Sequence, residues 1–355
     1  MAVKTVPISE VQPGMILGEH IMSSRRRILL AAGTVLTPSM ITSLNTWDIL
    51  NVMIQDASQE TAAAVEVPAV TPDPAPTPFA AKYKRLSDTV SDLFDAYRNT
   101  RKVLFLDFRE ASYAVYSLVT TGGTMSYLLL ESQSPKADYL GQHAVTVSAI
   151  AGSIARWMDW EPEDIKHLCL AALMHDIGKV SLPLSLISGL NLQTDTEKAI
   201  YRLHPEEGMK ILSPLRGVSA DILAAVAQHH EFMDGSGFPR KLRDGEIHPF
   251  ARIITLADTF HTLSQQTDQP NPFYLAESML HDMVGKLDIA VVDTFTRRIR
   301  DYLLSHRILL SDGRKAEVVY LQQNESRYPV IKTEDDEYID LRKNREIKIS
   351  GIVKR

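Results

Sequence analysis

The chain has 355 residues, with 44 acidic against 38 basic side chains, a formal net charge of -6 and 45% hydrophobic residues. This composition is ordinary for folded domains and excludes disorder of the chain as a whole. The excess of acidic residues disfavours non-specific binding to DNA. The single cysteine, Cys169, excludes an internal disulfide and a thiolate zinc site, and it is typical of a reducing cytosol.

The sequence shows no signal for secretion or membrane insertion. The first residues, MAVKTVPISEV, lack the basic segment and the apolar run of a secretory signal. The longest unbroken apolar run, Leu168 to Met174, is far shorter than the roughly 18 residues of a membrane span. We therefore expect a cytoplasmic protein without direct membrane insertion, and the length predicts two or three domains.

Residues 1–57 have short alternating apolar patches separated by glycine and proline. This pattern is typical of a small β-rich module. We predict strands near 15–22, 27–30 and 49–54, and one short helix from Thr37 to about Leu44.

A Pro/Ala-rich linker spans residues 58–81, where five prolines between Thr61 and Ala81 disfavour helix and sheet. Residues 82–306 then show helical periodicity, which predicts a mainly α protein built around a multi-helix bundle. Residues 307–355 return to strand and turn patterns and predict a small β C-terminal appendage. The predicted helices lie near 82–99, 107–120, 136–157, 163–176, 194–212, 218–230, 250–265, 273–283 and 289–304.

Five histidines and two aspartates of the helical region form an ordered series. Successive groups are 32, 28, 25 and 28 residues apart, about one helix plus its return, so each group falls on a successive helix or at its end. A bundle can aim such residues at a pair of metal ions. A single histidine on an apolar helix face is more often a packed core residue, but the matched spacing favours a metal site. The candidate ligands are His143, His175, Asp176, His204, His229, His230 and Asp258.

The types of ligand indicate the chemistry. Imidazole and carboxylate without thiolate suit Fe, Mn, Zn or Ni, and Asp176 can bridge two ions. Two metals about 3.5 to 4 Å apart polarise a phosphoryl group and hold a hydroxide at neutral pH, which predicts phosphoester hydrolysis. Lys179 lies four residues after His175, on the same helix face, where its ammonium can neutralise charge developing on a phosphate oxygen. We therefore expect Asp176 and Lys179 to act in catalysis.

Four strings together resemble the signature of the HD-GYP domain, a branch of the HD superfamily of metal-dependent phosphohydrolases. They are His175-Asp-Ile-Gly-Lys179, His204-Pro-Glu-Glu-Gly208, HHEFMDGSGFP at 229–239 and ARIITLAD at 251–258. The resemblance covers about residues 135–305, and residues 1–57 look like the short module that often precedes this domain. It implies an HD-type helical bundle that hydrolyses cyclic di-GMP to pGpG or GMP in bacterial second-messenger signalling.

The resemblance also implies a role for each ligand. Asp176 resembles the carboxylate that bridges two metals. Members with three metals have a glutamate where this chain has Tyr139, so the sequence favours two divalent ions, with Fe or Mn before Zn or Ni. The implied ligands of one ion are His204, His229 and His230, and those of the other are His175 and Asp258, with His143 either completing this second set or serving a third ion.

The rim of the site departs from the family pattern. Phe238 stands where the name-giving motif has tyrosine, which keeps the ring and loses a hydroxyl. Residues 259–272 have Gln, Thr, Asp and Pro where the family usually has a basic stretch that is expected to contact substrate. The candidate substrate contacts that remain are the permissive loop glycines Gly235 and Gly237, the ring of Phe238, and the guanidinium groups of Arg240 and Arg252.

Other functions stay open at this point. The altered rim allows a phosphohydrolase for another cyclic dinucleotide or nucleotide, and a third reading is a weakly active or inactive cyclic di-GMP receptor or interaction module. The resemblance implies a diguanylate cyclase or other signalling protein as a partner, and a homodimer is a further alternative. We interpret the remaining histidines, His261 among them, as surface or packing residues. Glu231 is interpreted either as a residue that orients His229 or His230, or as an exposed carboxylate.

Overall fold

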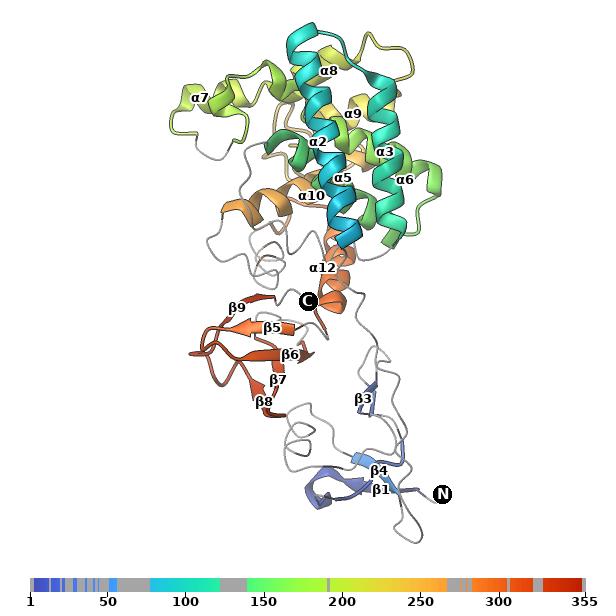
Figure 1. Ribbon diagram of the computed structural model, residues 1–355, viewed down its shortest axis with the longest axis vertical. Helices are drawn as coiled ribbons and strands as arrows, with labels where there is room; N and C mark the ends of the chain where they lie inside the picture. Colours follow the sequence, from blue (N-terminus) through green and yellow to red (C-terminus); the bar gives the residue numbers. More distant parts are fainter. Residues whose placement is uncertain are drawn as a thin grey trace. The chain divides into compact units, whose positions relative to one another are not determined.

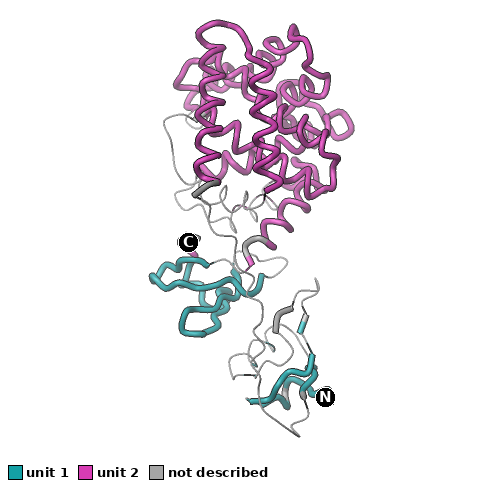
Figure 2. Tube along the Cα trace, turned by 45° about the vertical axis from the view of Figure 1, so that its right-hand side comes forward, with its two compact units in different colours: residues 1–72, 305–322, 328–348 teal, residues 73–304, 323–327, 349–355 magenta. Residues whose placement is uncertain are grey.

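The computed structural model describes residues 3–22 and 28–55 with gaps, 77–121, 139–266 except 190 and 191, 275, 279, 283–304, 307–321 and 328–352. The chain divides into two compact units, one of residues 1–72, 305–322 and 328–348 and the other of residues 73–304, 323–327 and 349–355 (Figure 2). The expectation of a mainly helical protein with a small β part near each end of the chain is confirmed (Figure 1).

The N-terminal residues form two short antiparallel ladders. β1 (Val3–Pro7) pairs with β4 (Asn51–Gln55), and β2 (Ile21–Met22) pairs with β3 (Ile28–Leu30). The sequence does not predict β1, because its alternation is only five residues long and ends in proline. The strand predicted over 15–22 is reduced to β2, and Leu17 makes a single bridge to Ile54. The helix predicted over 37–44 lies largely outside the described residues.

The helical unit carries the metal-ligand candidates. Its principal helices are α2 (Thr77–Thr100), α3 (Phe105–Thr120), α5 (Tyr139–Trp157), α6 (Pro162–Met174), α7 (Asp195–Tyr201), α8 (His204–Leu212), α9 (Ala220–Gln228), α10 (Pro249–Gln266) and α12 (Ile289–Leu303). Two short 3₁₀ turns, η2 (Ile177–Ser181) and η3 (Leu184–Leu186), follow α6. No helix of the described part of the chain combines the length and the apolar character needed to cross a membrane.

Two helix boundaries differ from the sequence prediction. α2 begins at Thr77, inside the predicted linker, because a proline is tolerated in the first turn of a helix, where its missing N–H has no helical acceptor. The helix predicted over 194–212 is two helices, α7 and α8, because Pro205 cannot donate the backbone hydrogen bond that would continue α7 into α8. The helix predicted over 273–283 lies mostly outside the described residues.

α5 is the central helix of the bundle and packs against α2, α3, α6, α10 and α12. Small and β-branched side chains such as Ala144, Val147 and Ile150 are at most 1% exposed, so the surrounding helices meet them closely. Gly141 lies where α5 meets α2: a Cβ at this position would be 2.7 Å from the backbone nitrogen of Ser91. The close packing of α5 holds the helix-borne ligand His143 at a fixed depth in the bundle.

The C-terminal residues form a five-stranded sheet in the order β8-β7-β6-β5-β9, in which β8 and β7, β7 and β6, and β6 and β5 pair antiparallel. The small β appendage that the sequence predicts is confirmed, and buried and exposed residues alternate along β5 and the first part of β6. The strands are β5 (Arg307–Leu310), β6 (Lys315–Tyr320), β7 (Val330–Thr333), β8 (Tyr338–Asp340) and β9 (Ile349–Ile352).

Candidate metal centre

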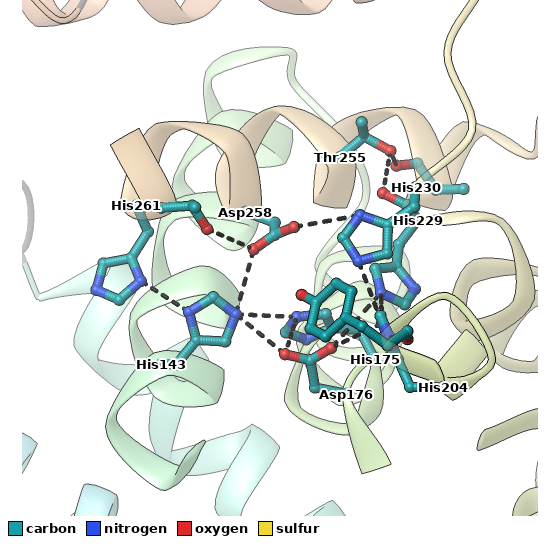
Figure 3. Close-up of polar contacts among 12 residues, drawn as sticks. His143, His175, Asp176, His204, His229, His230, Thr255, Asp258 and His261 are labelled. Carbon is teal, nitrogen blue, oxygen red and sulfur yellow. Dashed lines mark hydrogen bonds and ion pairs between the residues drawn. The ribbon is translucent and has the colours of Figure 1, made fainter. Parts of the chain in front are cut away.

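The structure brings all seven candidate ligands to one centre inside the helical bundle (Figure 3). His143 lies on α5, His175 and Asp176 between α6 and η2, His204 at the start of α8, His229 and His230 directly after α9, and Asp258 on α10. All except His230 are at most 7% exposed, and His230 is partly buried. The convergence comes from helix ends and facing helix surfaces, as the spacing of the groups predicts.

The ligand atoms form two adjoining clusters. Asp176, His204, His229 and His230 make up the first, and His143, His175 and Asp258 make up the second. Within each cluster, one ligand atom from every residue lies within 4.8 Å of the others. This grouping matches the one that the family resemblance implies, and it places His143 with the second set.

Backbone carbonyls fix the protonated nitrogen of three of these histidines. The distances are 2.7 Å from His175 Nδ1 to Ala172 O, 2.7 Å from His204 Nδ1 to Tyr201 O, and 2.8 Å from His229 Nδ1 to Val226 O. Each carbonyl belongs to the last turn of a helix, where it lacks a partner within that helix. Because a carbonyl only accepts, each Nδ1 carries the proton and each Nε2 presents a bare lone pair.

These bare nitrogens face one another. His204 Nε2 lies 3.1 Å from the Nε2 atoms of both His229 and His230. Between His204 and His229 no proton is available to form a hydrogen bond, so the two lone pairs repel unless a cation lies between them. Burial lowers the pKa of His204 to about 4, which keeps this imidazole neutral, as a metal ligand must be. The donor set therefore fits a bound metal ion.

Asp176 lies between the two clusters. Its Oδ1 is 3.3 Å from His204 Nε2 on the side of the first cluster, and its Oδ2 is 3.2 Å from both His143 Nε2 and His175 Nε2 on the side of the second. Both oxygens are buried, and apart from the ion pair of Oδ2 with Lys179 they have no hydrogen-bond partner among the described residues. Burial alone would raise the pKa of Asp176, but interactions with the His175 imidazole and the Lys179 ammonium outweigh it and hold the pKa well below its usual value. An ionised carboxylate with one oxygen toward each cluster fits a bridge between two cations.

Asp258 completes the second cluster. Its Oδ1 lies 3.2 Å from His143 Nε2 and accepts a hydrogen bond of 3.2 Å from the hydroxyl of Thr262, one helical turn further along α10. Burial opposes ionisation of Asp258, yet the hydrogen bond and charge of His143 hold its pKa well below the usual value. The second cluster therefore combines two imidazoles and a carboxylate that stays ionised.

Lys179 is part of the buried centre. Its side chain is 2% exposed, and its Nζ lies 2.7 Å from Asp176 Oδ2 and 5.0 Å from the centroid of the Tyr201 ring. The ammonium thus has an ion pair on one side and an aromatic face on the other. The sequence places Lys179 on the same face as His175, and the structure places it directly against the bridging candidate Asp176.

Two small features of the motif strings explain how the helix ends meet. Pro205 has no N–H to offer Tyr201 O, four residues earlier, so this carbonyl is available to accept from His204 Nδ1. Gly178 lies directly against the start of α8: a Cβ here would clash with the carbonyl oxygen of His204 and lie 2.6 Å from the nitrogen of Gly208. Glycine at 178 therefore lets Asp176 and His204 approach each other.

The loop after His230 is held by Glu231. Its carboxylate accepts hydrogen bonds from the backbone nitrogens of Arg240, at 2.6 Å, and Leu242, at 3.0 Å. Glu231 is 2% exposed, so the interpretation as an exposed carboxylate is wrong, and the contacts made by its carboxylate are to the loop backbone. The sequence cannot reveal this because the partners are main-chain groups nine and eleven residues away.

The same loop positions the candidate substrate contacts. A Cβ at Gly237 would lie 2.5 Å from the backbone of residues 230–232, and Gly235 has a φ of 79°, so both glycines are required by the path of the loop. The Phe238 ring stacks on the imidazole of His230, with centroids 4.6 Å apart and planes at 23°. The rim of the site is therefore formed here by the Phe238 ring, which packs against the metal-ligand candidate His230.

The two arginines of the candidate rim differ in their partners. Arg240 is exposed, and its guanidinium contacts Met209 Sδ at 3.8 Å. Arg252 is already paired, with its guanidinium 2.9 Å from Asp288 and 3.3 Å from Asp244. Of the altered stretch 259–272, the structure describes residues 259–266, which continue α10.

The sequence interpretation overlooks two residues beside the centre. His261 is interpreted as a surface or packing residue, but it is 3% exposed and its Nδ1 lies 2.8 Å from His143 Nδ1. Tyr201 supplies the carbonyl for His204, and its ring centroid lies 4.9 Å from that of His204. For His261 a signal does exist, since it follows Asp258 by three residues and hence lies on the same helix face. Tyr201 has no such signal.

Comparisons with known proteins identify the domain. A family model described as HD domain matches residues 127–291. The chain is 28% identical over 179 residues to "Cyclic di-GMP phosphodiesterase PA4108" of Pseudomonas aeruginosa, covering 50% of this chain and 43% of the relative. It is 28% identical over 183 residues to "3'3'-cGAMP-specific phosphodiesterase 1" of Vibrio cholerae, covering 50% and 42%. It is 31% identical over 218 residues to "Cyclic di-GMP phosphodiesterase" of Thermotoga maritima, covering 58% of each.

The chain thus spans about half the length of the curated relatives that it matches. Among solved structures, Bd1817, described as a HDG"Y"P protein from Bdellovibrio bacteriovorus, superposes with a TM-score of 0.53 at 16% identity, covering 84% of this chain and all of that one. This likeness shows a shared fold. The resemblance expected from the four motif strings is confirmed: residues 127–291 match the HD domain family model.

Proposed function

We propose that this chain is a metal-dependent phosphodiesterase that hydrolyses cyclic di-GMP to pGpG, GMP or both. The observation that carries the proposal is the pair of adjoining clusters, in which unprotonated imidazole nitrogens and an unsatisfied carboxylate converge at a buried centre. Two divalent ions held there would activate water and withdraw charge from a phosphoryl oxygen at neutral pH. The nitrogen and oxygen donors favour Fe or Mn and also suit Zn or Ni.

Each residue of the centre would have a distinct role in this reaction. Asp176 holds one carboxylate oxygen toward each cluster and would be a ligand of both ions. Lys179 keeps a positive charge at the buried centre, where it can offset negative charge that develops on the phosphate. His230 extends from the first cluster to the Phe238 ring, which offers a flat surface for a base.

The rim supplies the remaining contacts in this proposal. Gly235 and Gly237 shape the loop, and Arg240 is the better candidate for a phosphate contact because Arg252 is paired with Asp288. The guanidinium of Arg202 lies 5.7 Å from the Phe238 ring centroid and adds a positive charge to the same rim. Loss of one charge-assisted phosphate contact costs about 1.5 to 3 kcal/mol, so a rim with fewer cations weakens binding without removing the centre.

A second candidate substrate is another cyclic dinucleotide. Two observations favour it: Phe238 lacks a hydroxyl at the rim, and one of the matched relatives is named as specific for 3'3'-cGAMP. A receptor or interaction module with little catalysis is the third alternative. The converging ligand set argues against it, because binding alone has no chemical need for seven converging metal-ligand residues.

Turnover and metal content measured on one sample test the proposal. Protein purified without oxygen and loaded with Fe(II) or Mn(II) is incubated with cyclic di-GMP and, separately, with 3'3'-cGAMP, and the products are separated by chromatography. We expect cyclic di-GMP to be hydrolysed, and an Asp176→Asn variant to lose metal and turnover together. Asp221→Asn is the matched control, because Asp221 pairs with His248 outside the centre and should leave both unchanged. A wild type that binds two ions and hydrolyses neither dinucleotide would contradict the proposal, and clear preference for 3'3'-cGAMP would establish the second candidate.

A further inference from the structure

His261 makes a contact with the second cluster that the proposed mechanism does not use. It lies on α10, one helical turn after Asp258, and its Nδ1 is 2.8 Å from His143 Nδ1 (Figure 3). The two ring centroids are 4.9 Å apart, and both side chains are buried, with 1% of His143 and 3% of His261 exposed. A polar contact between two buried rings on facing helices restrains both of them.

The contact determines which nitrogen of His143 can face a metal. His143 Nε2 points into the second cluster, where it lies 3.2 Å from His175 Nε2 and from one oxygen each of Asp176 and Asp258. When Nε2 gives its lone pair to a cation, the proton of the neutral ring resides on Nδ1. That proton is then directed at the Nδ1 lone pair of His261, 2.8 Å away.

We infer that His261 is a positioning residue for the second ion, which holds His143 with its Nε2 lone pair toward the cluster by accepting the hydrogen bond from Nδ1–H. The inference rests on the proposed function only in taking the two clusters to bind metal ions. The partner of a metal-bound histidine is usually a carboxylate, a carbonyl or water. Here it is an imidazole, which adds no negative charge to the centre.

An imidazole partner also differs from a carbonyl in being able to donate. The Nδ1 atoms of His175, His204 and His229 each contact a backbone carbonyl, which can only accept, so each of these rings donates through Nδ1. The Nδ1 of His143 instead contacts another imidazole, so the direction of this hydrogen bond depends on which nitrogen of His261 carries its proton.

This inference predicts an order of affinities for the second ion. His261→Asp keeps an acceptor and cannot donate when ionised, so it holds His143 in the metal-binding form and should bind the second ion at least as tightly as the wild type. His261→Leu offers neither acceptor nor donor. This variant should lower the affinity for the second ion by about 10- to 100-fold, the usual effect of losing the hydrogen-bond partner of a metal ligand. The first cluster has no direct part in this contact, so both variants should keep one ion there.

Mn(II) titration followed by elemental analysis and electron paramagnetic resonance tests the order. The wild type and His261→Asp should hold two ions with the spectrum of a coupled pair, whereas His261→Leu should hold one ion with the spectrum of isolated Mn(II) at the same free metal concentration. Ser264→Ala is the control for damage to α10, because Ser264 is buried and its hydroxyl donates to the backbone oxygen of His261. This variant should keep two coupled ions.

Several outcomes would overturn the inference. Two coupled ions in His261→Leu at wild-type affinity would show that no acceptor is needed. A second-ion affinity in His261→Asp that is tenfold or more below the wild type would show that ring packing matters and the acceptor does not, and this arm decides the question even if His261→Leu fails to fold. Fewer than two ions in the wild type would overturn the proposed function together with this inference, so the two failures are distinguishable.

Discussion

Lys179 Nζ lies 2.7 Å from Oδ2 of Asp176, and both side chains are almost completely buried. The pair balances charge at the point where the two clusters meet. With two cations bound, Asp176 would have other positive partners, and the ammonium of Lys179 would be free to act on the substrate. Without cations, the ammonium of Lys179 is the nearest permanent positive charge to this buried carboxylate. The role of Lys179 in stability should therefore depend on the metal.

Replacing Lys179 by methionine should destabilise the metal-free protein more than the metal-loaded protein. Removing one member of a buried ion pair costs about 3 to 5 kcal/mol because the other charge is left uncompensated. Bound ions would compensate Asp176 and reduce this cost. Urea unfolding of the variant and the wild type, each with metal and with chelator, measures the difference.

The matched control is Lys210→Met, which removes an ion pair with Glu207 on the exposed face of α8. Exposed ion pairs contribute at most about 1 kcal/mol to the free energy of unfolding. The loss of stability in Lys210→Met should therefore be the same with and without metal. Equal loss of stability by Lys179→Met in the two metal states would contradict the assignment of Asp176 to the metal bridge.

Gly178→Ala should damage the fold and the metal centre together. The new methyl group would clash with the carbonyl oxygen of His204 and press on the nitrogen of Gly208, and both are backbone atoms that cannot rotate away. Relief requires α8 to move away from η2, which separates His204 from Asp176. We expect a loss of about 1 to 3 kcal/mol, as for other overpacked cores, with lower metal content at saturation. Ser181→Ala in the exposed last position of η2 should leave both unchanged, and full metal content in Gly178→Ala would refute this account.

The sequence predicts the centre better than its surroundings, and the reason is physical. His175, Asp176, His204 and His229 occur in short strings at helix ends, so their spacing alone places them on successive helices. The division between α7 and α8 depends on a missing donor at Pro205, an effect that periodicity does not show. The position of His261 depends on α10 facing α5, a contact between residues 118 positions apart. Local patterns thus identify the ligands, whereas the groups that orient them are set by tertiary packing.

The loop that contains Phe238 is a similar case. The sequence identifies its glycines as turn residues. The two sides of the loop are joined by the carboxylate of Glu231, which accepts hydrogen bonds from main-chain nitrogens, and such bonds cannot be predicted from a residue pattern. The N-terminal strand β1 is missed for a related reason, since its pairing with β4 joins residues about 48 positions apart.

Glu231→Gln should loosen this loop while leaving the metal content unchanged. The amide keeps one acceptor, but its NH₂ group would face a backbone N–H that now lacks an acceptor, at a cost of about 1 to 3 kcal/mol. His229 and His230 precede the loop and keep their own contacts, so the expected effect is a higher KM with little change in bound metal.

Glu246→Gln is the matched control for this effect. Glu246 is exposed and accepts from the nitrogen of Arg243 in the same loop, where water can replace the lost bond. Its KM should stay near the wild-type value. A fall in metal content in Glu231→Gln would instead show that the carboxylate supports the ligands themselves.

Cys169 should be inert to thiol reagents in the folded protein. The side chain is completely buried on α6, and burial raises the pKa of its thiol to about 12, with a hydrogen bond from the Ser148 side chain in partial opposition. Because only the thiolate reacts, labelling by a disulfide reagent at pH 8 should follow unfolding and not precede it. The raised pKa also gives the sign of the pH dependence: the unfolded thiol ionises first, so this residue's contribution to stability is complete below about pH 9 and is lost between about pH 9 and 12. Reaction rates measured across a urea series test the point, and rapid stoichiometric labelling without urea would show that α6 opens far more readily than its buried contacts allow.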